Sequence, residues 1–233
     1  GDAVRMNLQR RTLVCVLSGV AVVAAALAVT LVLVSRGGGN ESTTTAAATN
    51  ATRSALLTGI PQRGIELGDP SAPPLYEYAD IQCPYCAEFS NHVLPSVIRS
   101  YVRTGKVKLV FHGLAFIGPD STKALRAVQA AGLQNRLWDV LDGVYARQGK
   151  ENAGWVTDDL LKEIGGGVAG LDTARWLDET GSDAVTTRIS DAAEAASTAG
   201  VNSTPSFVFK GQLLQLQSLD PADFKAALDP LLG

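Results

Sequence analysis

The chain has 233 residues, a formal net charge of −3 and 18% charged residues. This length allows one domain of moderate size plus a tail. No basic stripe runs along the sequence, which argues against nucleic acid as a partner. The three cysteines, Cys15, Cys83 and Cys86, are too few for a structural disulfide framework.

The N-terminal region predicts a membrane anchor at residues 13–34, a run without a single charged residue. As a helix this run would be roughly 33 Å long, enough to cross the core of a bilayer. Three arginines precede it and one follows closely, which places residues 1–12 in the cytoplasm. The run exceeds the ~7–15 residues of a cleavable signal peptide, so we expect an uncleaved anchor; small residues at 25–28 keep cleavage as the alternative.

Residues 35–63 predict a flexible tether between the anchor and a globular domain. The first part of this segment is rich in Gly, Ser, Thr, Ala and Asn and has no periodic apolar face. Order is expected from residue 64, so the folded domain is predicted to span 64–233.

The first part of this domain reads as strands and one helix. Alternation in the main strand places Leu75, Glu77 and Ala79 on one face. Pro95 predicts a kink in the helix that follows, and Gly105 closes that helix. The expected elements are an edge strand at 65–67, a strand at 75–79, a helix at 88–104 and a strand at 106–112.

A helical pattern dominates the next part of the chain. Consecutive helices within an α/β frame indicate an inserted helical subdomain at about 115–199. Its expected helices, three of them capped by Ser121-Thr122, Thr157 and Asp172, cover 123–134, 136–148, 158–164, 173–180 and 183–199. A hairpin of strands at 206–210 and 213–217 follows, and the last helix is capped by Asp220 with Pro221 in its first turn.

The motif Cys83-Pro84-Tyr85-Cys86 lies where the strand passes into the helix. A Cys-x-x-Cys pair in this context is typical of a thioredoxin-like redox site. Unpaired N–H groups of the first helical turn favour the thiolate of Cys83, the reactive form. Cys86 is one turn further on, close enough to attack a mixed disulfide made by Cys83.

The order of elements, together with the motifs at 78–86 and 200–208, resembles the DsbA family, and its membrane-anchored branch most of all. The resemblance covers about 64–233. It implies an α/β chain with a thioredoxin-like fold and an inserted helical subdomain, preceded here by one transmembrane helix. Two motifs about 120 residues apart are far more specific than one Cys-x-x-Cys pair.

The resemblance also implies a role for each matching position. Cys83 would be the exposed nucleophile and Cys86 the buried resolving cysteine. Pro205 would be a cis-proline lying against the disulfide, and Thr204 would pair with the backbone of an extended substrate. Glu77 would be a buried acid that passes protons to or from Cys86; the alternative is a strand residue facing solvent.

The catalytic motif differs from that of the strongest oxidants in this family. Between the cysteines stand Pro84 and Tyr85, where those oxidants carry Pro-His, and Thr204 stands where they often carry Val. Without that histidine, thiolate stabilisation depends more on helix N–H groups, and Thr204 also occurs in isomerase-type relatives. The redox direction therefore stays open between an oxidant and a reductase or isomerase.

The leading hypothesis is an extracytoplasmic thiol:disulfide oxidoreductase that introduces disulfides into reduced exported proteins, because chains outside the membrane meet an oxidising setting. The resemblance implies reoxidation by a DsbB-like or vitamin K epoxide reductase-like membrane enzyme, and no cofactor. Tyr85 and Phe116 are candidates for an apolar edge that holds substrate. The alternatives are a zinc site with His92 and His112, a glutaredoxin, and a redox-silent adaptor on the same frame.

Overall fold

The computed structural model describes residues 55–233. The chain divides into two units, residues 1–52 and 53–233, and all described residues belong to the second. The predicted anchor at 13–34 lies outside the described residues. Within 55–233, no helix combines the length and the apolar character needed to cross a membrane.

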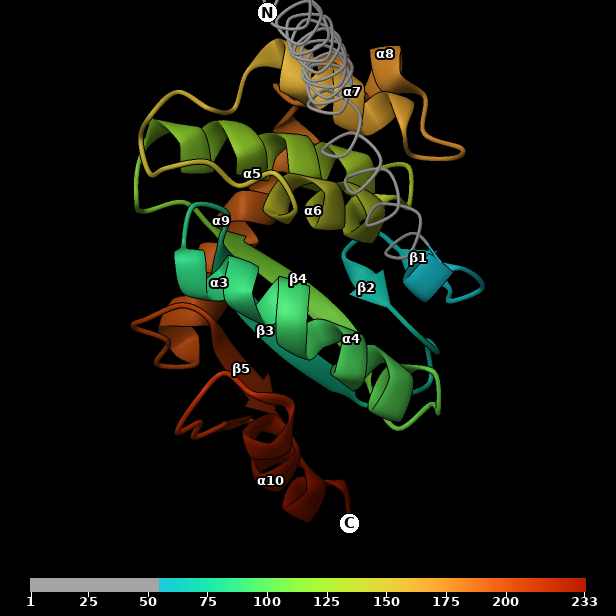
Figure 1. Cartoon of the computed structure of the whole chain (residues 1–233), viewed down its shortest axis with the longest axis vertical. Helices are drawn as coiled ribbons and strands as arrows, with labels where there is room; N and C mark the ends of the chain where they lie inside the picture. Colours follow the sequence, from blue (N-terminus) through green and yellow to red (C-terminus); the bar gives the residue numbers. More distant parts are fainter. Residues whose placement is uncertain (1–54) are drawn as a thin grey trace, which may run out of the picture. The chain divides into compact units, whose positions relative to one another are not determined.

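A six-stranded sheet in the order β1-β2-β4-β3-β5-β6 forms the centre of the domain (Figure 1). β3 and β4 run parallel, and every other neighbouring pair is antiparallel. The parallel pair requires a crossover, which the helix after the motif supplies. The strands are β1 (Gln62–Arg63), β2 (Glu66–Leu67), β3 (Pro74–Asp80), β4 (Lys108–Leu114), β5 (Ser206–Phe209) and β6 (Gln212–Leu213).

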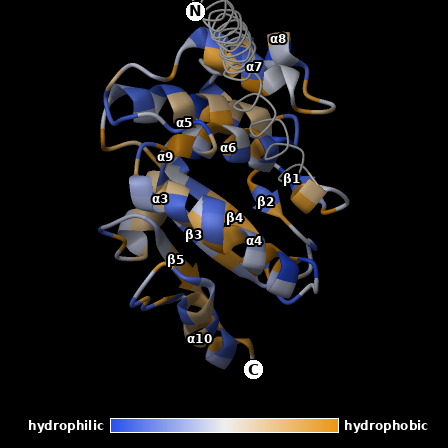
Figure 2. Ribbon diagram, in the orientation of Figure 1, coloured by the Kyte–Doolittle hydropathy of each residue, from blue (hydrophilic) through white to orange (hydrophobic). Residues whose placement is uncertain are grey.

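The two faces of the sheet are covered differently. Leu75, Glu77 and Ala79 are all buried, as the predicted alternation of β3 requires, and the two apolar ones belong to the main core. On the opposite face, Tyr78 packs with Val208 and with Ala196 of α9 (Asp183–Thr198). Figure 2 shows apolar segments along the strands and polar residues along much of the helical exterior.

The helix after the motif departs from the prediction in its winding. It begins at Pro84, which agrees with the motif placed in its first turn although the helical pattern alone indicated 88–104, and it passes through two π-helical stretches instead of a single kink. Pro95 has no N–H to continue the helical ladder, so the preceding turn widens. The successive segments are α3 (Pro84–Glu88), η1 (Phe89–Val93), α4 (Leu94–Val97) and η2 (Ile98–Val102).

β4 covers 108–114, whereas the sequence pattern predicted a strand at 106–112. The amides of Lys106 and Val107 donate to the carbonyl of Tyr101 and close the turn after η2. Pairing with β3 then starts at Lys108, opposite Pro74. The register of the parallel pair therefore sets this boundary, and the alternation of apolar residues does not.

The folded domain begins before residue 64, so the predicted tether is too long at its C-terminal end. Leu57 is buried in the core, and β1 pairs with β2 as the outer strand. The strand predicted at 65–67 is thus β2, which lies inside the sheet instead of at its edge. The side chain of Gln62 helps to attach β1 to the folded domain, because it donates to Asp139 at 2.8 Å and accepts from the amide of Trp138.

The predicted helical insertion is present between β4 and β5. Thr157 and Asp172 cap their helices as predicted, each accepting a backbone N–H with its side chain. The first helix starts at Pro119 and not at 123, because proline fits the first turn, where its N–H is not needed. The helices that precede α9 are α5 (Pro119–Gly132), α6 (Leu137–Tyr145), α7 (Asp158–Gly166) and α8 (Thr173–Glu179).

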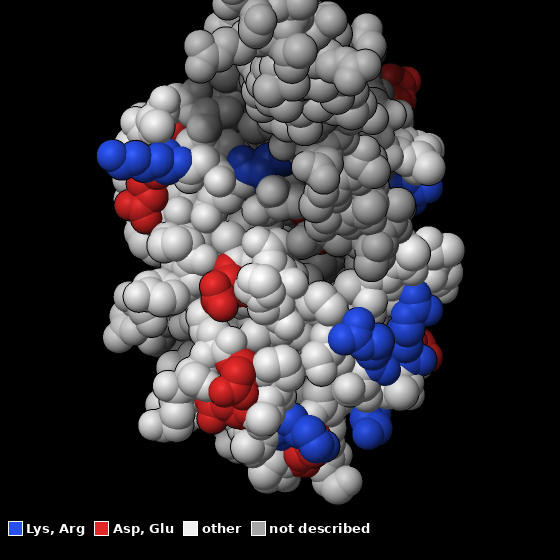
Figure 3. All heavy atoms as spheres, viewed as in Figure 1, with Lys and Arg blue, Asp and Glu red and all other residues white. Residues whose placement is uncertain are grey.

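α5 to α8 gather at one end of the sheet, and α9 passes behind β3 and β4 (Figure 1). The C-terminal helix α10 (Pro221–Leu232) is capped by Asp220 as predicted, and Phe224 packs on Phe89 and Phe207 of the core. The predicted strand at 213–217 is shorter, since β6 covers only Gln212–Leu213. Figure 3 shows charges of both signs dispersed on the face in view, with uncharged surface between them.

Candidate active site

The dithiol motif lies at the end of β3 and the start of α3. Cys83 is the N-cap residue of α3 in an extended conformation, and Pro84 occupies the first helical turn. The carbonyl of Cys83 accepts the amides of Cys86 and Ala87 at 3.1 and 3.2 Å. This geometry leaves the amides of the first turn directed toward the sulfur of Cys83, as expected from the sequence.

Both cysteines are free thiols, and Cys83 is less accessible than predicted. Only 6% of Cys83 is exposed, so the expectation of an exposed nucleophile is wrong in degree, while Cys86 is fully buried as expected. The loop before β5 lies against Cys83, whose thiol donates to the carbonyl of Thr204 at 3.4 Å. Tyr85 and this loop border the same groove.

The two thiols differ in acidity because their surroundings differ. A hydrogen bond from the Cys86 thiol lowers the pKa of Cys83 to about 6; burial opposes this effect, and the Thr204 side chain and the amides of Cys86 and Tyr85 add to it. Burial raises the pKa of Cys86 well above its ordinary value, and the hydrogen bond and charge of Cys83 raise it further. Cys83 is therefore the sulfur that ionises at neutral pH.

Glu77 is buried on the β3 face that points into the main core, with 1% of its surface exposed. The predicted burial is confirmed, and the solvent-facing alternative is wrong. Burial raises the pKa of Glu77 to about 8, so the carboxyl keeps its proton at neutral pH. Its Oε2 atom has no hydrogen-bond partner among the described residues, which leaves it available for transient proton exchange.

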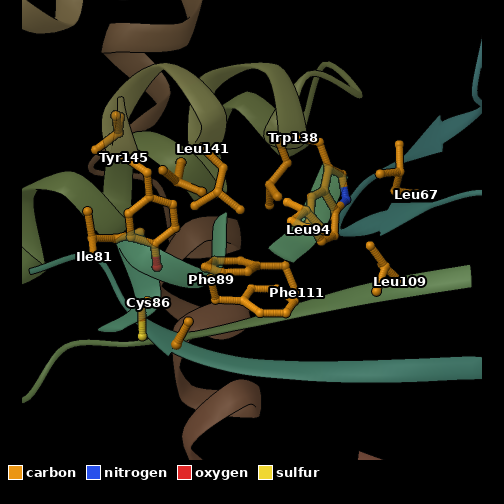
Figure 4. Packing of buried hydrophobic residues seen from close by; sticks show 14 of the residues in the cluster. Leu67, Ile81, Cys86, Phe89, Leu94, Leu109, Phe111, Trp138, Leu141 and Tyr145 are labelled. Carbon is orange, nitrogen blue, oxygen red and sulfur yellow. The ribbon is translucent and has the colours of Figure 1, made fainter. Parts of the chain in front are cut away.

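Tyr145 brings a phenol from α6 into the same buried region. Its hydroxyl donates to the carbonyl of Asp80 at 3.3 Å, and Figure 4 shows this hydroxyl pointing toward Cys86. Burial, followed by the nearby charges of Cys86 and Glu77, raises the pKa of Tyr145. Tyr145 falls within the helix predicted at 136–148, and nothing in the sequence pattern indicates that it reaches the cysteines.

Thr204 and Pro205 are joined by a cis peptide bond, as predicted. The loop is held from both sides, because Ser206 pairs with Tyr78 of β3 and its hydroxyl donates to the carbonyl of Ser203 at 2.7 Å. Pairing of β5 with β3 thus brings Pro205 opposite the motif, although the two lie about 120 residues apart in sequence.

Next to the dithiol lies a groove of about 590 Å³. Its walls come from Tyr85, Pro205 and the segment from Leu213 to Leu219. Tyr85 is 66% exposed, Phe116 is 62% exposed, and Leu213 is the third exposed large apolar residue of the described chain. Tyr85 and Leu213 line this groove, and exposed apolar side chains on one surface indicate a binding site for an apolar partner.

Asp80 is a buried residue of the site to which the sequence pattern assigned no role. Its carboxylate accepts four hydrogen bonds, from the amides of Gln82, Phe116 and Ile117 and from the hydroxyl of Ser121, at 2.5–3.2 Å. Four donors satisfy a buried carboxylate that would otherwise be costly. The position of Asp80, three residues before Cys83, was the one available signal.

The histidines of the zinc alternative do not join the cysteines. His92 is exposed on η1, whereas His112 packs edge-on against Tyr76 and Tyr78. Within residues 55–233, no group of three or more His, Cys, Asp or Glu side chains is arranged to hold a metal ion.

Two thiols of unequal pKa at a helix N-terminus, facing a cis-proline loop, define a dithiol redox site on a thioredoxin-like frame. Comparison with known proteins agrees. A family model described as Thioredoxin matches residues 62–230, so the chain belongs to the thioredoxin family. The predicted resemblance to the DsbA family is confirmed by relatives that are named disulfide bond formation proteins, and the solved structures share the fold.

Among the relatives, the probable disulfide bond formation protein D of Bacillus cereus is 37% identical over 101 residues, and the disulfide bond formation protein D of Bacillus subtilis is 28% identical over 101 residues. Each match covers 42% of this chain. It covers 47% of the Bacillus cereus protein and 46% of the Bacillus subtilis protein, so the chain spans about half the length of these relatives. The fold is similar to that of oxidised BdbD from Bacillus subtilis (TM-score 0.65, 19% identity, 74% of this chain and 97% of that one). It is also similar to DsbA2 of Pseudomonas aeruginosa (TM-score 0.56, 24% identity, 75% and 97%).

Proposed function

We propose that this protein is a thiol:disulfide oxidoreductase that exchanges the Cys83–Cys86 disulfide with cysteines of other proteins. The observation that carries the proposal is the difference in acidity between the two sulfurs, one with a pKa of about 6 and one well above 9.0, opposite the Thr204–Pro205 loop. A low-pKa thiol is both a good nucleophile at neutral pH and a good leaving group.

In the oxidising direction, a substrate thiolate attacks the sulfur of Cys83. A bond forms between the two sulfurs, the Cys83–Cys86 bond breaks, and its electron pair goes to Cys86. A second substrate thiolate then attacks the substrate sulfur of this mixed disulfide and expels the Cys83 thiolate. The substrate leaves with a new disulfide, two electrons poorer, and the enzyme keeps them as its dithiol.

The departing Cys86 thiolate is buried and needs a proton. Glu77 is protonated at neutral pH because burial raises its pKa to about 8, and it lies in the same buried region. We assign it the role of proton donor to Cys86 in this direction and of acceptor when the disulfide forms again. The groove beside Tyr85 and Pro205 is the proposed binding surface for the extended substrate chain.

We place this activity outside the cytoplasmic membrane, with reduced exported proteins as substrates. The support is the apolar run at 13–34 and the names of the relatives, which are disulfide bond formation proteins. A DsbB-like or vitamin K epoxide reductase-like membrane enzyme would return the dithiol to the disulfide. The second candidate function is a reductase or isomerase fed with electrons from the membrane. Tyr85 and Thr204 are the residues that favour this alternative, because both differ from those of the strongest oxidants.

The reduction potential of the Cys83–Cys86 pair separates the two candidates. A reduction potential of about −120 mV supports the oxidant, and a potential of about −270 mV supports the reductase. The exchange chemistry itself is tested with Cys86→Ala whose Cys83 has first been converted to a mixed disulfide with oxidised glutathione; a substrate thiolate should displace glutathione and stay trapped as a mixed disulfide on Cys83. The matched variant Cys83→Ala should trap none, and the absence of adducts on Cys86→Ala would refute the mechanism.

A further inference from the structure

The end of α6 reaches the backbone of the dithiol motif. Tyr145 is the last residue of α6, and Gln148 lies in the loop that follows. The hydroxyl of Tyr145 donates to the carbonyl of Asp80 at 3.3 Å. Nε2 of Gln148 donates to the carbonyls of Ile81 at 2.7 Å and of Cys83 at 3.1 Å. Two side chains of the helical insertion thus hold three backbone carbonyls between residues 80 and 83.

A second contact between the insertion and this segment involves a side chain of the segment instead of its backbone. The amide of Asn152 donates to Oε1 of Gln82 at 2.6 Å, and Nε2 of Gln82 donates to Oδ1 of Asn152 at 3.0 Å. That contact fixes the residue before the motif, whereas Gln148 acts on Cys83 itself. Gln148 is therefore the contact best placed to affect the reactive sulfur.

The loop that carries Gln148 is itself anchored. The amide of Gln148 donates to the carbonyl of Tyr145 at 3.3 Å. Gly149 lies so close to Trp155 that a Cβ atom at residue 149 would be 2.6 Å from the Cβ atom of the tryptophan. Both partners of the Gln148 side chain are carbonyls, so only its amide nitrogen can face them. A fixed loop thus presents a hydrogen-bond donor to the motif.

The carbonyl of Cys83 accepts three donors, Nε2 of Gln148 and the amides of Cys86 and Ala87. Holding this carbonyl fixes the extended conformation of Cys83, with ψ at 120°. That angle determines how the first turn of α3 faces the sulfur, because Cys83 is its N-cap residue. The amides of Tyr85 and Cys86 are among the groups that lower the pKa of the Cys83 thiol. Gln148 therefore keeps the donors of the thiolate aligned.

The two redox states depend on this contact to different degrees. In the disulfide form, the bond between Cys83 and Cys86 closes a ring over residues 83–86 and holds the motif covalently. In the dithiol form, which this structure shows, both cysteines are free and the geometry depends on hydrogen bonds. Loss of the Gln148 donors should therefore cost the dithiol form more than the disulfide form. A protein whose reduced form is stabilised is a stronger oxidant.

We propose that Gln148 is a positioning residue that stabilises the dithiol form of the motif relative to the disulfide form, so that the helical insertion raises the oxidising power of the site. The inference rests on the proposed function and adds to it a residue that adjusts the redox equilibrium. Gln148 acts through the backbone of Cys83.

Two substitutions of Gln148 and one control test this role. Gln148→Met keeps the length of the side chain and removes the donor. Gln148→Glu keeps the shape and places a negative charge against the two carbonyls. The matched control is Gln134→Met, because Gln134 is also half-buried and its Nε2 donates to the carbonyl of Asp172 at 3.2 Å, where the turn after α5 meets the N-cap of α8.

The assay is equilibration of each protein with mixtures of reduced and oxidised glutathione at pH 7, followed by acid quenching and measurement of the dithiol fraction. Two glutathione thiols together lose two electrons and two protons and leave as glutathione disulfide, while the Cys83–Cys86 bond breaks and becomes the dithiol. Gln148→Met should lower the equilibrium constant for this reduction about fivefold, the effect of one lost hydrogen bond. This fall corresponds to a reduction potential about 20 mV lower. Gln148→Glu should lower the constant further, and Gln134→Met should stay within about twofold of wild type.

Urea unfolding of both redox forms separates positioning from a merely structural role. Gln148→Met should lower the free energy of unfolding of the dithiol form more than that of the disulfide form. Equal losses in the two forms, or an equilibrium constant that matches that of Gln134→Met, would overturn the proposal. Failure of both Gln148 variants to fold as disulfides would also overturn it, because the disulfide form should tolerate the loss. If wild type reached no redox equilibrium with glutathione, the proposed function itself would fail, which is a distinguishable result.

Discussion

Replacing Glu77 with Gln should change how the stability of the protein depends on pH. In the folded protein the pKa of Glu77 is raised from 4.5 to about 8 by burial. Below pH 4.5 the carboxyl is protonated in both the folded and the unfolded chain. Between pH 4.5 and about 8 only the unfolded chain releases the proton, so the stability of wild type falls as the pH rises.

The size of this effect follows from the pKa difference. Each pH unit of difference corresponds to about 1.4 kcal/mol. Raising the pKa of Glu77 from 4.5 to about 8 therefore costs the folded protein about 5 kcal/mol once the carboxylate is charged in both states. Glu77 is 1% exposed, so little solvent screening reduces this cost. Gln carries no charge at any of these pH values and does not incur it.

The assay is urea unfolding of reduced wild type and of Glu77→Gln at several pH values from 4 to 9. The variant should gain up to about 5 kcal/mol relative to wild type between pH 4.5 and 8, with constant differences on either side. Glu77→Leu should show the same pH dependence of the free energy of unfolding. Its stability should differ from that of Glu77→Gln by a constant amount, because Leu has neither the charge of Glu nor the polar amide of Gln. A difference that stays flat across this range would refute the raised pKa and, with it, the role of Glu77 as proton donor.

Three further predictions concern the cysteines and Asp80. Alkylation of reduced protein by iodoacetamide should follow the ionisation of Cys83 with a midpoint near pH 6, and Thr204→Val should move the midpoint upward because one hydrogen bond to the thiolate is lost; a midpoint above 8 in wild type would contradict this reasoning. Since the pKa of Cys83 is lowered on folding, the reduced form should lose stability relative to the disulfide form as the pH falls from 9 to 6, which unfolding of both forms measures. Asp80→Asn should lower the free energy of unfolding by about 3 kcal/mol, because an amide cannot accept four donors; a loss below 1 kcal/mol would show that the network relaxes.

Local signals in the sequence predicted much of the fold. Thr157, Asp172 and Asp220 cap helices as expected, because a cap depends only on a side chain and an amide three residues further on. The start of β4 was predicted two residues too early, because it depends on pairing with β3 and on a turn closed by the carbonyl of Tyr101. Strand boundaries are tertiary properties, whereas helix caps are local ones.

The candidate site divides in the same way. The Cys83–Cys86 pair and the Thr204–Pro205 motif have short sequence signatures, and the structure brings them together. Tyr145 and Asn152 reach the site from 65 and 70 residues away from their partners, Asp80 and Gln82. Nothing in their own neighbourhood in the sequence marks them, because their contacts exist only once the helical insertion has packed on the sheet.

The direction of exchange can be argued from the fate of the mixed disulfide. Two thiols compete for it: Cys86, which would close the disulfide of the enzyme again, and a second thiol of the substrate, which would carry the disulfide away. Attack requires a thiolate, and the raised pKa of Cys86 keeps its thiolate fraction small. Expulsion of Cys83 is favoured, because thiols of low pKa leave faster.

Thr204 favours the transfer of the disulfide to the substrate instead of opposing it. The Thr204 side chain is one of the groups that lower the pKa of Cys83, an effect that Val, the residue common in strong oxidants, does not supply through a hydroxyl. At position 85 it is the backbone amide that contributes, and any residue other than proline provides it. The acidity of Cys83 thus survives without a histidine between the cysteines, and the balance of the two sulfurs supports disulfide donation as the proposed direction.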